Sequence, residues 1–162
     1  MIEAEVATDG STCTLSQRPF RYLRGDQDSD TPTWQIPVRI RTTGGEHRTL
    51  LGADPVELTL DGRLLTLNAG ATGFHRSLGP DGVDPANLTA VERAAVLDDR
   101  WAATLADLVQ PGGFMDLAAA VTGRPGGEAD LAVWHSVLRG LGTIELVAPE
   151  HHDRWAAEAS GL

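Results

Sequence analysis

Three aspartates at alternate positions are the first candidates for chemistry in this 162-residue chain. Asp26, Asp28 and Asp30 have the spacing of a calcium-binding loop, in which alternate carboxylates coordinate the ion. The rest of that loop is missing, because Thr31 takes the sixth position, which needs glycine, and Pro37 takes the twelfth, which needs a bidentate glutamate. The pattern therefore predicts a solvated acidic loop and no calcium site.

The histidines are the next candidate metal ligands. His151 and His152 precede Asp153, but adjacent residues on a helix point in different directions, and no second ligand pair stands one helical turn away. The other three histidines are scattered singly: His47, His75 and His135. The histidines therefore predict no metal site.

Asp98 and Asp99 are the adjacent carboxylates that a general acid–base pair would need. Adjacent helical residues lie about 100° apart around the axis, so these two are not predicted to converge. Asp98 falls on the apolar face of its predicted helix, so we expect an arginine partner for it. Cys13, the only cysteine, is predicted to be a small core residue rather than a nucleophile. A hydrolase built on these aspartates and a histidine lacks a nucleophile and base at recognisable spacing, so no catalytic, cofactor-binding or metal residue is assigned.

Composition excludes several classes of partner. The formal net charge is −10, and all 13 basic residues are arginine, which argues against nucleic acid and anionic membranes. No secretion signal opens the chain, and no stretch approaches the ~20 apolar residues of a membrane span. We therefore expect a soluble, cytoplasmic protein. Met1 enters the first predicted strand with no lead-in, which suggests a piece cut from a longer chain.

The first half of the sequence is predicted to form about seven short strands. They cover residues 2–6, 12–17, 34–41, 48–51, 56–60, 64–68 and an extended run at 74–76. Turns are expected at Asp9-Gly10, Gly44-Gly45 and Asp61-Gly62, the first and last as tight hairpins. Pro37 cannot donate to a ladder, so its strand should lie at an edge or bulge. The pattern predicts an immunoglobulin-like antiparallel β-sandwich over residues 1–80.

Residues 88–162 are predicted to form an α-helical domain of antiparallel hairpins. Thr89 and Glu92 form a capping box that begins the first helix. Its apolar face is predicted from Val91, Ala94, Trp101, Leu105 and Leu108, and that of the third helix from Leu131, Trp134, Val137, Leu138 and Leu141. A break at residues 111–113 precedes a short second helix at 114–121, and Pro149 is expected to open a fourth helix that buries Trp155. The fold class is thus α+β, with strands first and helices second.

Five short patterns occur in order along the chain: LSQRPF at 15–20, WQIPV at 34–38, LNAGATGFHR at 67–76, RAAVLDDRW at 93–101 and EADLAVW at 128–134. They resemble the L-x-Q-x-x-F, W-x-I-P-V, L-N-x-x-x-x-G-Y-Y-R-V, R-x-x-L-I-x-D-A-F and E-x-D-Y-x-x-W patterns of the zinc aminopeptidases of the aminopeptidase N family. The resemblance spans residues 3 to about 146, and Asp99 matches the family aspartate. It departs at His75 and Ser77, which replace an aromatic residue and a valine, and at Gly79, where a tyrosine often follows.

The resemblance implies a β-sandwich that follows a catalytic domain, plus the start of a helical domain that covers the active-site cavity. In the family, H-E-x-x-H and a downstream glutamate bind Zn²⁺, which activates a water for attack on the N-terminal peptide bond. No histidine of this chain is followed by glutamate, and a G-A-M-E-N-like substrate motif is also missing. No catalytic or zinc-binding residue can therefore be carried over, and the zinc cofactor is expected in the catalytic domain of the parent.

The predicted function is that of a non-catalytic accessory fragment of a bacterial zinc metallo-aminopeptidase, inactive alone. It would brace the catalytic domain and position the helical lid, and it would meet the peptide substrate only through the parent. The alternative is a stand-alone protein- or peptide-binding module without enzymatic activity. Apolar helical surface left exposed by truncation is expected to support a homodimer.

Overall fold

The computed structural model describes residues 1–22, 32–80, 82, 84–147, 156–157 and 160. Three features predicted from the sequence lie outside these residues: the Asp26-x-Asp28-x-Asp30 pattern, the opening of the fourth helix at Pro149 with Trp155, and His151-His152-Asp153. No helix in the described ranges is long and apolar enough to cross a membrane.

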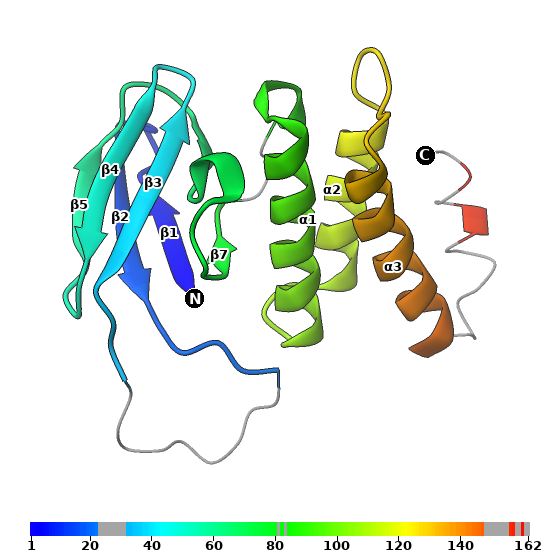
Figure 1. Cartoon of the computed structure of the whole chain (residues 1–162), viewed down its shortest axis with the longest axis horizontal. Coiled ribbons are helices and arrows are strands. Elements are labelled where there is room, and N and C mark those ends of the chain that lie inside the picture. The colour runs from blue at the N-terminus through cyan, green and yellow to red at the C-terminus, as the bar shows by residue number, and fades with distance from the viewer. Residues whose placement is uncertain (23–31, 81, 83, 148–155, 158–159, 161–162) are drawn as a thin grey trace.

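The predicted α+β class is confirmed: strands fill the first half of the chain and helices the second (Figure 1). The strands are β1 (Ile2–Val6), β2 (Thr12–Gln17), β3 (Ile36–Thr42), β4 (Glu46–Leu51), β5 (Val56–Thr59), β6 (Leu64–Thr66) and β7 (Ser77–Leu78). The α-helices are α1 (Ala90–Leu105), α2 (Pro111–Thr122) and α3 (Leu131–Val147). Two 3₁₀ turns, η1 (Ala69–Ala71) and η2 (Pro85–Asn87), lie between β6 and α1.

The strands form two sheets, ordered β5-β2-β1-β7 and β4-β3-β6. All strand pairs are antiparallel except β1 and β7, which run parallel and so depart from the predicted all-antiparallel sandwich. The tight hairpin predicted at Asp61-Gly62 is also wrong, because β5 pairs with β2 while β6 pairs with β3. This turn instead carries the chain from one sheet to the other, where the Asp61 carboxylate accepts from the Thr42 hydroxyl.

Strand β3 explains how a proline fits inside a sheet. Pro37 pairs with Leu50 of β4 on one side, but β6 pairs with β3 only at Arg41 and Thr42. On the β6 side, therefore, no described strand lies opposite the start of β3, and the missing N–H of Pro37 leaves no ladder bond unmade. The sequence prediction of an edge or bulge is met by this half-paired strand, whose register shifts between Arg41 and Thr42.

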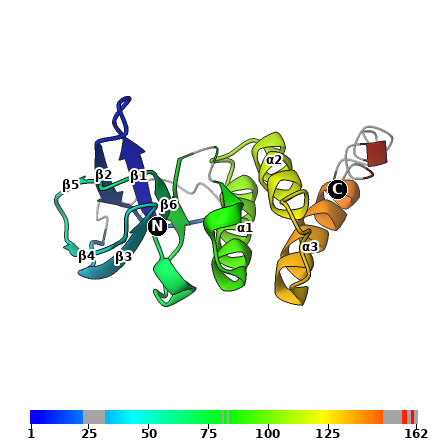
Figure 2. The same cartoon turned by 90° about the horizontal axis from the view of Figure 1, so that it is seen from above.

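The molecule has two separate apolar cores. Nine buried residues fill the sandwich: Ile2, Cys13, Leu15, Val38, Ile40, Leu51, Leu60, Leu64 and Leu67. Nine others fill the space between the helices: Leu97, Trp101, Phe114, Met115, Ala118, Val121, Val133, Val137 and Ile144. Helix α1 is the helix beside the sandwich in both views (Figures 1 and 2). The seam between sandwich and α1 therefore lies outside both cores.

Helix α1 meets the predicted apolar face only in part: Trp101 is buried and Ala94 packs against the helical core, but other predicted positions are not buried. Val91 and Leu105 are exposed, whereas Glu92 and Asp99 are buried together with Leu97. The reason is that α1 packs on two sides, its apolar side against the other helices and a polar side against the sandwich. Hydrophobic periodicity detects only the first of these sides.

The other two helices also differ from the predicted limits. Pro111 is the first residue of α2 rather than part of a break, as suits a residue without an N–H. In α3 the predicted Val137 is buried and the predicted Trp134 and Leu141 pack against the same core, but Leu131 and Leu138 are exposed. Val133 and Ile144 complete the buried face instead. Phe114 of α2 packs against this face, and its ring lies so close to α3 that a Cβ at Gly140 would meet it at 2.3 Å.

Candidate functional site

The first two patterns are joined by one side-chain amide. Gln17, at the end of β2, donates from Nε2 to the carbonyls of Trp34 and Gly52, each at 2.6 Å. Its Oε1 accepts from the Trp34 amide at 2.9 Å. The Gln17 amide thus bonds both backbone groups of Trp34 and ties the strand end of one sheet to the approach of β3 in the other.

The third pattern, residues 67–76, forms a braced bend between β6 and β7. Asn68 accepts from the Gly73 amide at 2.8 Å and donates to the Gly73 carbonyl at 3.0 Å. A Cβ at Gly73 would lie 2.2 Å from a ring atom of His75, so a larger residue there would have to displace the imidazole. Arg39 reaches the same bend through Thr72, at 3.2 Å. The bend ends by presenting Arg76 towards α1.

Arg76 joins the bend to the aspartates of the fourth pattern. Its Nη1 contacts Asp98 and lies 3.1 Å from Asp99, and Arg139 of α3 contacts Asp98 as well. The amide and hydroxyl of Ser77 donate to Asp99 at 2.9 and 2.7 Å. The predicted arginine partner of Asp98 is therefore confirmed, with a second arginine beside it. The prediction that Asp98 and Asp99 do not converge is wrong in one respect, because one guanidinium meets both.

Glu92 makes the second contact across the seam. One oxygen accepts from Arg41 of β3 and from the amide and hydroxyl of Thr89, at 2.9 and 2.8 Å. The other oxygen accepts from the Gly70 amide of η1 at 2.8 Å. The Glu92 carboxylate caps α1, as the capping-box prediction requires. The Glu92 side chain is only 2% exposed, and its contact with Arg41 also holds α1 against the sandwich.

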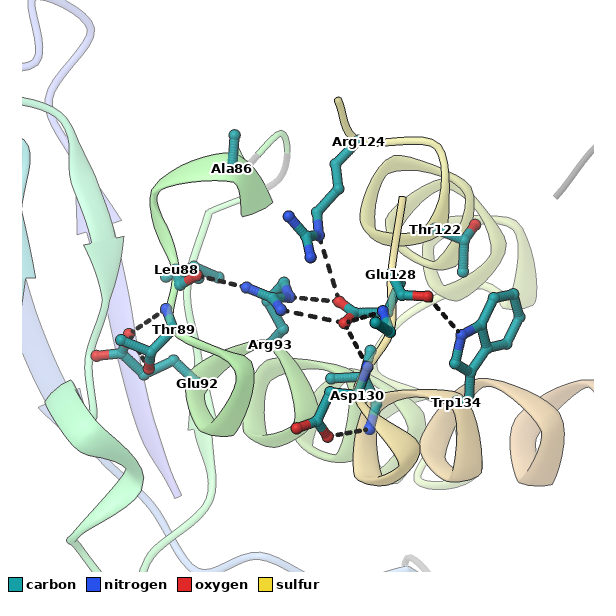
Figure 3. Close-up of polar contacts among 12 residues, drawn as sticks. Ala86, Leu88, Thr89, Glu92, Arg93, Thr122, Arg124, Glu128, Asp130 and Trp134 are labelled. Carbon is teal, nitrogen blue, oxygen red and sulfur yellow. Dashed lines mark hydrogen bonds and ion pairs between the residues drawn. The ribbon is translucent and has the colours of Figure 1, made fainter. Parts of the chain in front are cut away.

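Arg93 and Glu128 join the fourth pattern to the fifth (Figure 3). Arg93 donates to Glu128 through Nε at 2.6 Å and Nη2 at 3.2 Å, and to the Leu88 carbonyl at 2.6 Å. The Glu128 carboxylate also accepts from the amides of Ala129 and Asp130, both at 2.9 Å. Because the Glu128 carbonyl accepts from the Trp134 indole at 3.0 Å, this residue links α1, the α2–α3 connection and α3.

The charges at these contacts shift the pKa values in two directions. Burial alone would raise the pKa of Glu128, but the hydrogen bonds from Arg93, Asp130 and Arg124 outweigh it and hold the pKa at about 2. Burial would also raise the pKa of Asp98 and of Glu92. The hydrogen-bond donors around each carboxylate outweigh it and keep each pKa below its ordinary value. At Asp99 burial prevails over Ser77 and Arg76, and the pKa is raised.

Acid is therefore expected to destabilise the fold through Glu128. Its pKa is about 2 when folded and 4.5 ordinarily, so its contribution of about 3 kcal/mol is present above pH 4.5 and is lost as the pH falls towards 2. Asp99 acts oppositely, since a raised pKa favours folding once the carboxyl is protonated. Urea unfolding between pH 7 and 2.5 measures the effect. Glu128→Gln is expected to flatten the loss, and parallel loss in both proteins would contradict the assignment.

This arrangement stabilises structure and offers little for catalysis. Asp98, Asp99, Glu92 and Glu128 are all occupied by arginine or backbone donors. Cys13 is buried in the sandwich core, as predicted, and burial raises the pKa of its thiol. Within the described ranges, no group of three or more histidine, cysteine, aspartate or glutamate side chains could hold a metal ion.

The five sequence patterns contain most of the residues that make these contacts, but the sequence did not predict which residue pairs with which. Nothing in the spacing connects Arg93 with Glu128 or Arg41 with Glu92, because 35 and 51 residues separate the partners. Arg41 alternates with apolar residues along β3, and solvent is the ordinary partner of a polar strand face. The signal in the sequence was Asp98, a carboxylate on the predicted apolar face of its helix. No family model and no curated protein matches this chain.

Proposed function

We propose that the chain is a non-catalytic accessory region of a zinc metallo-aminopeptidase, in which a β-sandwich and the first helices of a lid domain form one braced unit. The parent removes N-terminal amino acids from peptides through zinc held in its catalytic domain. This region supports that domain and fixes the orientation of the lid over the active site. The carboxylates of this region hold the sandwich and the helices together instead of taking part in catalysis.

One observation carries the proposal: hydrogen bonds or ion pairs join three of the four successive pairs of patterns, and the second and third patterns line the same pocket. Gln17 holds Trp34, the Trp34 and 67–76 segments line one pocket, Arg76 holds Asp98 and Asp99, and Arg93 holds Glu128. Short patterns shared by chance would be scattered over the fold. Patterns retained to hold a sandwich against helices would be joined in this way, because buried ion pairs fix geometry more than they add stability.

The purified chain is expected to hydrolyse no aminoacyl-anilide and to bind no zinc stoichiometrically, because the carboxylates gathered at these contacts are paired and no described group of three or more ligand side chains could hold a metal ion. Metal analysis after dialysis and an anilide assay measure both. One tightly bound zinc per chain, or turnover removed by a chelator, would overturn the proposal. The coding region gives an independent test: a reading frame that continues upstream through H-E-x-x-H supports it, whereas initiation at Met1 favours the stand-alone binding module.

The outer face of α3 supports the further proposal that isolated chains form a homodimer. Leu131, Leu138 and Leu146 are 84%, 62% and 79% exposed at spacings that place them on one side of the helix. Gly142 lies on the same side, and a Cβ there would meet no atom within 4 Å, so a second helix could approach closely. Exposed apolar stripes of this kind mark association surfaces.

We expect concentration-dependent dimers of the isolated chain, measured by sedimentation equilibrium. Leu138→Glu is expected to weaken them at least tenfold, because it places a charge at the centre of the apolar stripe. Val91→Glu, at an exposed apolar position of α1, is the matched control and should leave association unchanged. A chain that stays monomeric at every concentration would reject the dimer.

A further inference from the structure

A pocket of about 680 Å³ opens on the sandwich, and Arg76, which contacts Asp98 of α1, forms part of its lining. It is lined by Met1, Phe20, the start of β3 from Trp34 to Pro37, Arg39 and residues of the bend between β6 and β7. This volume lies within the range of ligand-binding sites in proteins. The same sites combine apolar walls with a few polar groups, as this pocket does.

Aromatic side chains that ordinary folding would bury stand exposed around this pocket. Phe74 is fully exposed, and Trp34 and Tyr22 are about half exposed. Phe20 packs edge-on against Tyr22 with the ring centres 5.0 Å apart. Half of the eight aromatic residues of the chain thus gather here. Exposed phenylalanine, tyrosine and tryptophan are the usual anchors of protein interfaces.

The backbone beneath these rings is already held in place. Gln17 fixes both backbone groups of Trp34, and Asn68 fixes both backbone groups of Gly73, the residue before Phe74. Trp34 and Phe74 therefore need little ordering before they bind a partner, which lowers the entropic penalty of association. The Phe74 side chain is fully exposed, so burial against the described residues does not explain why its ring points outward.

The lining of the pocket has basic side chains and no acidic ones, although Arg39 is paired with Glu46 and Arg76 with Asp98 and Asp99, which lie outside the lining. The chain has a formal net charge of −10, yet no aspartate or glutamate lines the pocket, whereas Arg39, Arg76 and His75 do. Among the described residues, Arg39 uses three of its five N–H groups on Glu46 and Thr72, which leaves two to bind a ligand. The buried Nε2 of His75 has no hydrogen-bond partner among the described residues.

We propose that this pocket binds an extended protein segment in which an apolar or aromatic side chain stands beside carboxylates. The apolar side chain packs between Trp34 and Phe74, and a neighbouring carboxylate pairs with Arg39. The segment lies along the start of β3, beside which no described strand pairs on the β6 side. Pro37 offers no N–H there, so side chains rather than a backbone ladder supply the affinity. This inference does not depend on the aminopeptidase proposal.

The test uses an acetylated, amidated peptide, Gly-Asp-Asp-Phe-Glu-Leu-Asp-Gly, titrated into ¹⁵N-labelled full-length chain. We expect saturable shifts of the Trp34 indole and Phe74 amide signals. Phe74→Ser is expected to weaken binding at least tenfold, because it removes an aromatic anchor of the interface. Arg39→Gln is expected to weaken binding about fivefold, because an exposed ion pair contributes less binding free energy. Because Phe74 is fully exposed, its replacement should leave the melting temperature unchanged.

Two controls separate this site from non-specific attraction. Leu50→Ser, at an exposed position of β4 outside the pocket, should bind the peptide as the unmodified chain does. A peptide with lysine at every acidic position should bind at least tenfold more weakly. Equal binding of both peptides, binding that survives Phe74→Ser, or self-association through Phe74 in the absence of peptide would each overturn the proposal.

Discussion

Replacing Glu128 by glutamine is expected to lower the melting temperature by about 10 °C, because loss of a buried counter-charge costs about 3 kcal/mol and each kcal/mol shifts a chain of this size by about 3 °C. The Glu128 side chain is 1% exposed, and its partner Arg93 is 8% exposed. Glutamine keeps the volume but leaves the guanidinium buried without a counter-ion. Thermal unfolding followed by circular dichroism measures the change.

A matched variant separates this effect from the loss of one surface charge. Asp116→Asn removes the same charge from an exposed position of α2 and is expected to shift the melting temperature by less than about 2 °C. Adding Arg93→Met to Glu128→Gln should restore part of the stability, because the unpaired cation is then gone. A double variant less stable than Glu128→Gln would show that the ion pair is not the cause.

Replacing Glu92 by glutamine is expected to destabilise the chain by about 3 kcal/mol and to loosen α1 from the sandwich. Its two oxygens accept from four donors: the amide and hydroxyl of Thr89, the Gly70 amide and Arg41. A glutamine amide would turn a donor towards at least one of these donors and leave Arg41 without its charge partner. Urea unfolding measures the loss.

The cap and the seam can be told apart by a second substitution. Thr89→Ala removes only the capping hydroxyl and is expected to cost about 1 kcal/mol. Arg41→Met removes the contacts of Arg41 with Glu92 and with the Asn87 carbonyl, and the remaining donors still satisfy the carboxylate. If Thr89→Ala alone reproduced the full loss of Glu92→Gln, the contribution of Glu92 would be confined to the helix cap.

Local patterns predicted the strands and helices well, because turns and caps are decided by near neighbours. Asp9-Gly10 and the Thr89–Glu92 cap needed only their own residues and φ preferences, and Gly10 does take a positive φ of 73°. The Asp61-Gly62 hairpin failed because the same two residues also suit a crossing between sheets. Only the pairing of β5 with β2 and of β6 with β3 decides between them.

The buried faces of the helices could not be predicted from apolar spacing alone. Leu131 and Leu138 carry more apolar surface than Val133, yet the valine is buried, on the side of α3 where Phe114 of α2 packs against Gly140. Buried charges raise the same difficulty on α1. Glu92 and Asp99 are buried because Arg41 and Arg76 arrive from the sandwich, and a hydrophobicity pattern counts both as solvent-facing.

Differential scanning calorimetry tests most directly whether the polar contacts join the two halves into one unit. The two apolar cores are separate, so the carboxylates of α1 are the groups that couple them. We expect a single transition for the unmodified chain and two transitions, one for each core, in the Arg76→Met, Glu92→Gln double variant. Two transitions in the unmodified chain, or one unshifted transition in the double variant, would contradict the coupling.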